Sequence, residues 1–176
     1  PPAGVPAIVP VLAISGVPFN GPDLLGFGGD CTDDLAVDWV KAGFLFPFLR
    51  NHCGRGQRDQ EPFAFPPAVT EVFRRYVRLR YKLLPTLYSL FAAQEERGEA
   101  ILAPLNLHFD DPALDRIADQ FMVGPFLLQA PFLEEKAKTR TVILPGTAPW
   151  IDASTGETVP AGEHVAKNGR LSTPLY

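Results

Sequence analysis

The sequence has few cysteines, with only Cys31 and Cys53 among its 176 residues. Two cysteines that lie 22 positions apart are too few for a zinc site, and they are compatible with one disulfide or with two free thiols, of which free thiols are favoured. A basic stripe is also missing, since the formal net charge is -4 and Lys and Arg are scattered along the chain. A nucleic acid is therefore not expected as a partner.

Long apolar runs are absent as well. No run approaches the roughly 20 residues that cross a bilayer, so no membrane span is expected. The apolar N-terminal stretch "PPAGVPAIVPVLAISG" has no basic segment before it and is interrupted by Pro2, Pro6 and Pro10. It is a poor match to a signal peptide, and the sequence leaves the compartment open.

The first half of the chain reads as alternating strands and helices. The apolar run 14–19 ends in a turn-forming segment that contains Asp23, which predicts a buried strand followed by a tight turn. Thr32 can cap a helix whose first turn holds two acidic residues and which ends before Pro47. Residues 50–61 then form a polar loop. The segment "GFGGD", residues 26–30 before the helix that Thr32 can cap, lacks the spacing of a phosphate-binding loop.

A second helix is predicted from Pro66 and Pro67 onwards. Its apolar face recurs at helical spacing, and Gly98 is a suitable end. Pro85 should kink or break this helix near residues 81–84. Arg80 falls on the apolar face, where its guanidinium needs a carboxylate or carbonyl partner.

The rest of the chain changes character. Residues 100–109 predict a strand and residues 114–121 a short helix, while short runs separated by Gly-containing turns follow from Gly124. The order of elements predicts an α/β unit over residues 1–120 and an antiparallel β-module over residues 121–176.

Several segments together resemble glycoside hydrolase family 31, the α-glucosidases and α-xylosidases. They are "SGVPFNGPDLLGF", "FLFPFLRNHCGRGQRDQEPF", "LRYKLLPTLYSLF", "APLNLHFDDPALDRIADQFMVGPFLLQAPFLE" and "LPGTAPWIDASTGE". The resemblance spans about residues 5–165. It implies the C-terminal portion of a (β/α)8 TIM barrel, with its seventh strand near Asp23 and its eighth within residues 100–109, followed by the beginning of an antiparallel β-sandwich.

The family resemblance implies a retaining α-glycoside hydrolase, most readily an α-glucosidase, that acts on an α-linked oligosaccharide or α-glucoside without a cofactor. Such hydrolysis needs two carboxyl groups about 5 Å apart. The family places both on earlier strands, so this chain would hold no catalytic residue of its own. The alternative is a non-catalytic sugar-binding or structural homologue. Either form could associate as a homo-oligomer or with the missing part of the enzyme.

The resemblance also implies which residues of this chain contact sugar. His52 takes the place of the family's hydroxyl-binding histidine, and Asp23 that of the acidic residue after the seventh strand. Pro22 and Leu25 differ from the family pattern around Asp23. Phe27 is a candidate to line the pocket, although a buried core position is the favoured interpretation. Arg50 and Asp59 are expected to form an ion pair or loop clamp that orients His52, and no metal ligand is expected.

Overall fold

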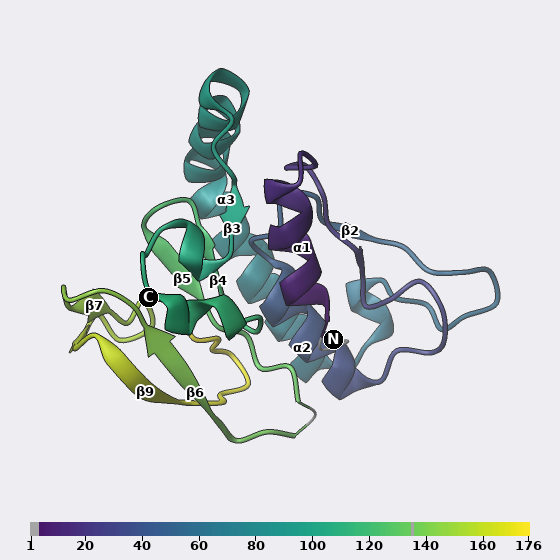
Figure 1. Cartoon of the computed structure of the whole chain (residues 1–176). Helices are drawn as coiled ribbons and strands as arrows, with labels where there is room; N and C mark the ends of the chain where they lie inside the picture. Colours follow the sequence, from purple (N-terminus) through teal and green to yellow (C-terminus); the bar gives the residue numbers. More distant parts are fainter. Residues whose placement is uncertain (1–3, 135) are drawn as a thin grey trace.

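The computed structural model describes residues 4–134 and 136–176, so Pro2, one of the three prolines noted near the N-terminus, lies outside the described residues. In this structure the N-terminal part is mostly helical and the C-terminal part is built from short antiparallel strands (Figure 1). Within the described residues, no helix is long and apolar enough to span a bilayer.

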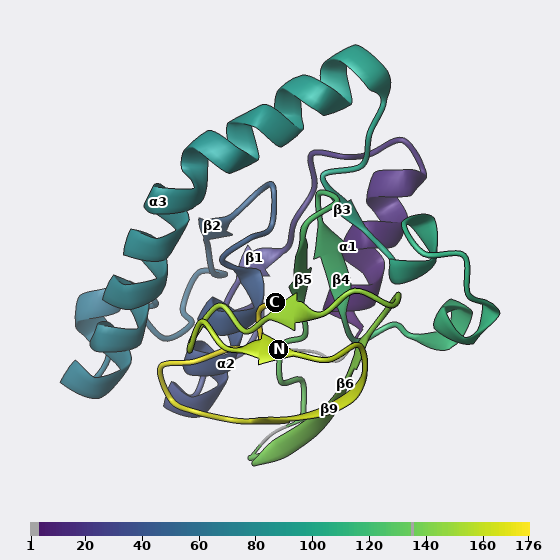
Figure 2. The ribbon, with the colours of Figure 1, turned by 90° about the vertical axis from the view of Figure 1, so that its left-hand side faces the viewer.

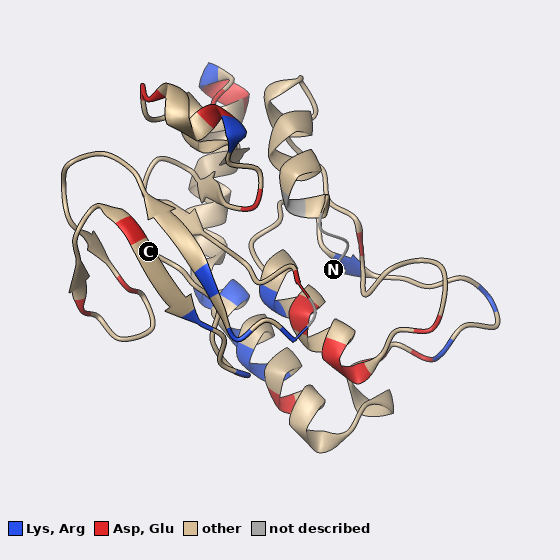
Figure 3. Cartoon of the chain, turned by 60° about the horizontal axis from the view of Figure 1, so that its bottom comes forward, with Lys and Arg blue, Asp and Glu red and all other residues tan. Residues whose placement is uncertain are grey.

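Helix α1 (Val5–Ile14) lies where the sequence indicated an interrupted apolar segment. Its sequence holds no acidic or basic residue, and its ribbon is accordingly tan in Figure 3. The strand predicted over residues 14–19 is wrong, because Ile14 ends α1 while Val17 and Phe19 are exposed. A short, mostly apolar segment of six residues does not distinguish a strand from a helix end, and here the helix takes its first residue.

Two very short strands follow and lie parallel. Strand β1 (Asp23–Leu24) pairs with β2 (Arg50–Asn51), with Asp23 opposite Arg50. Gly21 allows the segments leading into them to approach closely, because a Cβ atom there would lie 2.0 Å from the Phe48 carbonyl oxygen. The parallel pair thus brings residues 27 positions apart in the sequence side by side.

Two helices support this pair. Helix α2 (Asp33–Gly43) begins as predicted, with the Thr32 side chain accepting a hydrogen bond from the Leu35 amide. Helix α3 (Pro67–Arg97) buries most of the apolar face that the sequence predicted, with Leu83 and Phe91 partly buried and Leu84 exposed. It ends at Gly98, which has a left-handed conformation. It continues through Pro85 as one helix, so of the kink or break expected there, the break is wrong. Pro85 is exposed, so water can reach the carbonyl left without a donor, and Figure 2 shows that α3 as a whole is curved.

The structure of residues 100–123 differs from two further predictions. Strand β3 holds only Leu102–Ala103 and pairs antiparallel with β4 (Phe121–Val123), so the predicted strand over residues 100–109 and its assignment as a parallel barrel strand are wrong. Pro104 lacks the N–H that would continue the ladder, and 3₁₀ turns follow at Leu105–Leu107 and Pro112–Arg116 in place of the predicted helix over 114–121. The strand that follows β1 in the parallel pair is β2, and α3 is the next α-helix after it.

The remaining strands form the predicted antiparallel module. Strand β5 (Leu127–Gln129) pairs with β4, β6 (Thr139–Leu144) with β9 (Gly162–Lys167), and β7 (Trp150–Ile151) with β8 (Thr158–Val159). Residue 120, where the sequence predicts the domain boundary, lies between β3 and β4 of one sheet. The boundary itself stays a prediction.

The module contacts the helical part through buried polar groups. Lys41 on α2 is 2% exposed and donates to the Asn168 side chain at 2.6 Å and to the Gly169 carbonyl at 2.9 Å. Gln129 on β5 donates to the carbonyls of Lys41 and Ala42. These hydrogen bonds hold α2, which is the helix that precedes β2, against the β-module.

Candidate functional site

Asp23 and Arg50 form an ion pair across the parallel strands. The Arg50 Nε donates to the Asp23 Oδ1 at 2.5 Å, and this hydrogen bond raises the pKa of Arg50. The Asp23 side chain is 18% exposed and the Arg50 side chain 53%. The Arg50–Asp59 ion pair expected from the sequence is wrong, since Arg50 pairs with Asp23. Within residues 4–134 and 136–176, the exposed Asp59 side chain makes no hydrogen bond or ion pair.

His52 and Phe27 lie in ring contact beside this pair. Their ring centroids are 5.3 Å apart and their planes are inclined by 42°. Both side chains are exposed, and since Phe27 is 54% exposed, the buried core position favoured for it from the sequence is wrong. The Gly54 amide donates to the Phe27 carbonyl at 2.7 Å, which fixes the two segments to each other at this point. The structure therefore brings His52 and Phe27 together, one residue beyond β2 and three beyond β1.

Arg58 fastens the polar loop to the start of α2. Its amide donates to the Asp30 carboxylate at 2.7 Å, and its guanidinium donates to the Cys31 carbonyl and to the Asp33 carboxylate. The guanidinium also lies 4.4 Å from the ring centroid of Phe65. The loop, which extends to the right in Figure 1, is thus tied at several points despite its exposed position.

The two cysteines are free, as the sequence favoured. Burial raises the pKa of the Cys31 thiol to about 11, so this group is protonated at neutral pH. Cys53 lies one residue after His52 and is partly exposed. Across the part of the chain that is described, no group of three or more His, Cys, Asp or Glu side chains could hold a metal ion.

The strained backbone at Leu25 was not predicted from the sequence, where Leu25 was noted only because it differs from the family pattern around Asp23. Leu25 has a φ of 68°, in the left-handed region that side chains with a Cβ rarely adopt, and it is 2% exposed. It directly follows β1, where Asp23 lies. A strained residue at such a place is retained only when surrounding contacts hold it.

The strain at Leu25 predicts that glycine at this position gives a more stable protein than alanine, the reverse of the usual order. Leu25→Ala and Leu25→Gly both lose the packed side chain, but only glycine relieves the left-handed strain. We expect the free energy of unfolding, measured by urea denaturation, to be about 1 kcal/mol higher for Leu25→Gly than for Leu25→Ala. The matched pair at Leu24, which lies in β1 and is also buried, should show the usual order, with alanine the more stable. Equal or greater stability of Leu25→Ala would contradict the prediction.

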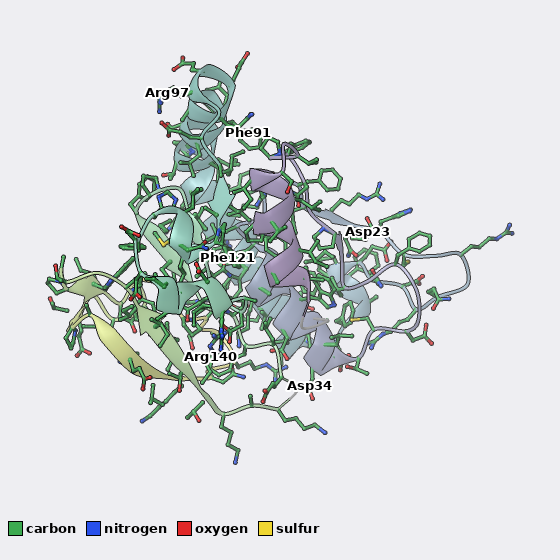
Figure 4. All side chains as sticks on the ribbon, viewed as in Figure 1. Asp23, Asp34, Phe91, Arg97, Phe121 and Arg140 are labelled. Carbon is green, nitrogen blue, oxygen red and sulfur yellow. The ribbon has the colours of Figure 1, made fainter. Side chains whose placement is uncertain are left out.

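The chemistry available at the site is that of binding polyhydroxylated molecules. A carboxylate accepts hydrogen bonds from hydroxyl groups, an imidazole can donate or accept, and an exposed aromatic ring offers an apolar face. Figure 4 shows Asp23 beside the long loop and Arg97 at the far end of α3. A hollow of about 750 Å³ near Arg97 is lined by residues that include Leu90 and His108, and none of Asp23, Phe27 or His52 contributes to it.

Asn51 and Gln60 are the residues of this region whose contacts the sequence did not predict in detail. Asn51 donates to the Gln60 carbonyl at 2.5 Å, and the Gln60 side chain donates to the Gly26 carbonyl at 3.0 Å. The signal in the sequence is only that amide side chains occur close to His52.

Comparison with known proteins gives a consistent result. Residues 4–90 match the profile described as "Glycosyl hydrolases family 31 TIM-barrel domain", and residues 98–176 match "Glycosyl hydrolase family 31 C-terminal domain". Alpha-glucosidase 2 of Bacillus thermoamyloliquefaciens is 37% identical over 167 residues, which is 94% of this chain and 21% of that protein.

Two solved structures have the same arrangement. The glucosidase II alpha subunit bound to Glc1Man2 superposes with a TM-score of 0.89 at 29% identity, over 96% of this chain and 19% of that one. An α-xylosidase from a soil metagenome complexed with xylose superposes with a TM-score of 0.88 at 26% identity, over 95% of this chain and 28% of that one. This chain therefore spans about a fifth to a quarter of the length of these proteins.

Proposed function

Since the chain belongs to glycoside hydrolase family 31, as the sequence motifs indicated, we propose that it is the sugar-holding part of a retaining α-glycoside hydrolase, most closely an α-glucosidase. In this proposal β1 and β2 are the last two parallel strands of a (β/α)8 barrel, and β4 to β9 begin a β-sandwich domain. The nucleophile and the acid/base residue lie on the preceding part of the longer protein.

The observation that carries the proposal is the contact of His52 and Phe27 just past the ends of two parallel strands, with Asp23 on the first of these strands. In barrel enzymes the loops at the carboxyl ends of the strands form the active site. His52 projects from the loop after β2 and Phe27 from the loop after β1, and their rings are in contact. Asp23 is aligned with Arg50 in the register of the pair. The site thus has donors, acceptors and an apolar face in one place.

In the proposed mechanism these residues bind and orient the sugar. The His52 imidazole and the Asp23 carboxylate hydrogen-bond ring hydroxyls, and Phe27 packs against the apolar side of the ring. Arg50 neutralises part of the charge on Asp23 and fixes its orientation. Hydrogen bonds that strengthen as the oxocarbenium-like transition state forms contribute to rate as well as to affinity.

The proposal is tested with the longer protein that contains this chain. It should hydrolyse 4-nitrophenyl α-glucoside, and proton NMR should show the α-anomer of glucose as the first product. Release of the β-anomer would contradict a retaining reaction. Saturable sugar binding without any turnover would instead favour the non-catalytic homologue.

Replacing Asp23 with asparagine should lower kcat/KM by about tenfold. Asparagine retains the shape and one acceptor oxygen, but charged hydrogen bonds are roughly twice as strong as neutral ones, so about 1–1.5 kcal/mol of transition-state binding is lost. Initial rates at several glucoside concentrations give the value. Asp110→Asn makes the same change at an exposed residue of the 105–112 turn region and should leave kcat/KM unchanged. Equal kcat/KM for both variants would remove Asp23 from the site.

A further inference from the structure

Gln60 is buried although it lies in an exposed, charged loop. It is 2% exposed, while its neighbours Asp59 and Glu61 are exposed. Its side-chain Nε2 donates to the Gly26 carbonyl at 3.0 Å, and its own carbonyl accepts from the Asn51 side chain at 2.5 Å. Gln60 therefore connects the turn after β1 with the end of β2.

The turn that Gln60 contacts needs such a restraint. Leu25 and Gly26 have φ angles of 68° and 87°, so two consecutive residues are in the left-handed region. This conformation sets the direction in which the chain leaves Asp23 and arrives at Phe27. A hydrogen bond to the Gly26 carbonyl fixes the peptide plane in the middle of that path.

We propose that Gln60 is a positioning residue of the sugar site, which holds the left-handed Leu25–Gly26 turn so that Phe27 stays in contact with His52. This inference rests on the proposed function of the site. Gln60 does not contact sugar in this arrangement. It acts through the Gly26 carbonyl on one side and through Asn51, the residue before His52, on the other.

The Gln60 side chain can position the turn while contributing little to the free energy of unfolding. Within the described residues, the buried Oε1 of Gln60 has no hydrogen-bond partner. An unpaired buried acceptor is unfavourable and offsets much of what the Nε2 hydrogen bond contributes. Replacing the amide with an apolar side chain of similar length should therefore change the free energy of unfolding little, while it releases the turn.

The test compares Gln60→Met with Gln57→Met, which makes the same change at a partly exposed glutamine of the same loop. The first measurement needs no sugar. The imidazole proton signals of His52 should carry a ring-current shift from Phe27, which a Phe27→Ala variant defines by its loss. We expect Gln60→Met to lose most of that shift and Gln57→Met to retain it. Retention of the full shift in Gln60→Met would overturn the proposal.

The second measurement is made on the longer protein. We expect kcat/KM for 4-nitrophenyl α-glucoside to fall about tenfold in Gln60→Met, with the melting temperature within about 2 °C of the parent. If the ring-current shift is lost but the parent protein hydrolyses no glycoside, the positioning role stands and the proposed function fails. If the parent is active and Gln60→Met retains both its kcat/KM and its shift, the proposed function stands and the positioning role fails.

Gln60→Glu provides a second variant if methionine prevents folding. It is isosteric, yet an ionised carboxylate cannot donate to the Gly26 carbonyl, so the same losses are expected. In the unsubstituted protein, the Nε2 protons of Gln60 should exchange slowly with solvent and show an NOE to the Gly26–Phe27 backbone. Fast exchange without that NOE would overturn the proposal without any variant.

Discussion

Replacing His52 with alanine should lower the turnover of an aryl α-glucoside by about 100-fold or more, because one donor aimed at developing transition-state charge is commonly worth that much. The melting temperature should stay within about 2 °C. The imidazole is exposed, and its ring contact with Phe27 is the one side-chain interaction that the described residues give it. Removal of an exposed side chain of this kind changes the free energy of unfolding by about 0.5 kcal/mol or less.

His164→Ala is the matched control for this prediction. His164 lies on β9, away from the parallel pair, and packs edge-on against Tyr176 at 5.8 Å. Its replacement should leave turnover unchanged. A His52→Ala protein with normal turnover and a markedly lower melting temperature would show that His52 has a packing role instead.

Arg80→Met should give the largest loss of stability, about 2–4 kcal/mol in the free energy of unfolding. As the sequence required, Arg80 has carbonyl partners: its guanidinium donates to Phe44 and Phe46 at 2.7 and 2.8 Å and to Pro47 at 3.2 Å. Methionine has a similar length but no donor, so these carbonyls lose their partner in a largely buried segment. That segment leads directly into β2, so the Asp23–Arg50 pair should also loosen.

The measurement is urea denaturation followed by circular dichroism at 222 nm. Arg78→Met serves as the control, since Arg78 lies on the exposed face of the same helix and should change the free energy of unfolding by less than about 0.5 kcal/mol. Arg80→Lys should fall between the two, because an ammonium group cannot match the fork that contacts three carbonyls. Equal free energies of unfolding for Arg80→Met and Arg78→Met would show that the hydrogen bonds of Arg80 to the three carbonyls do not stabilise the protein.

Features encoded by local spacing were predictable. The periodic apolar face of α3, the Thr32 cap and the left-handed Gly98 each depend on residues within a few positions of one another, and the structure confirms them. The predicted strands over 14–19 and 100–109 failed for a local reason too. Short apolar runs fit a helix end or a 3₁₀ turn as well as a strand, and Pro104 prevents the second from continuing.

The sequence by itself determined the family, through the order and spacing of its motifs, and it singled out His52 and Asp23 as candidates. Only the tertiary structure decided their surroundings: Arg50 pairs with Asp23 and not with Asp59, Phe27 contacts His52, and Gln60 joins the two loops. These contacts join residues about 25 to 34 positions apart. They depend on two parallel strands meeting in one register, which no local pattern of residues specifies.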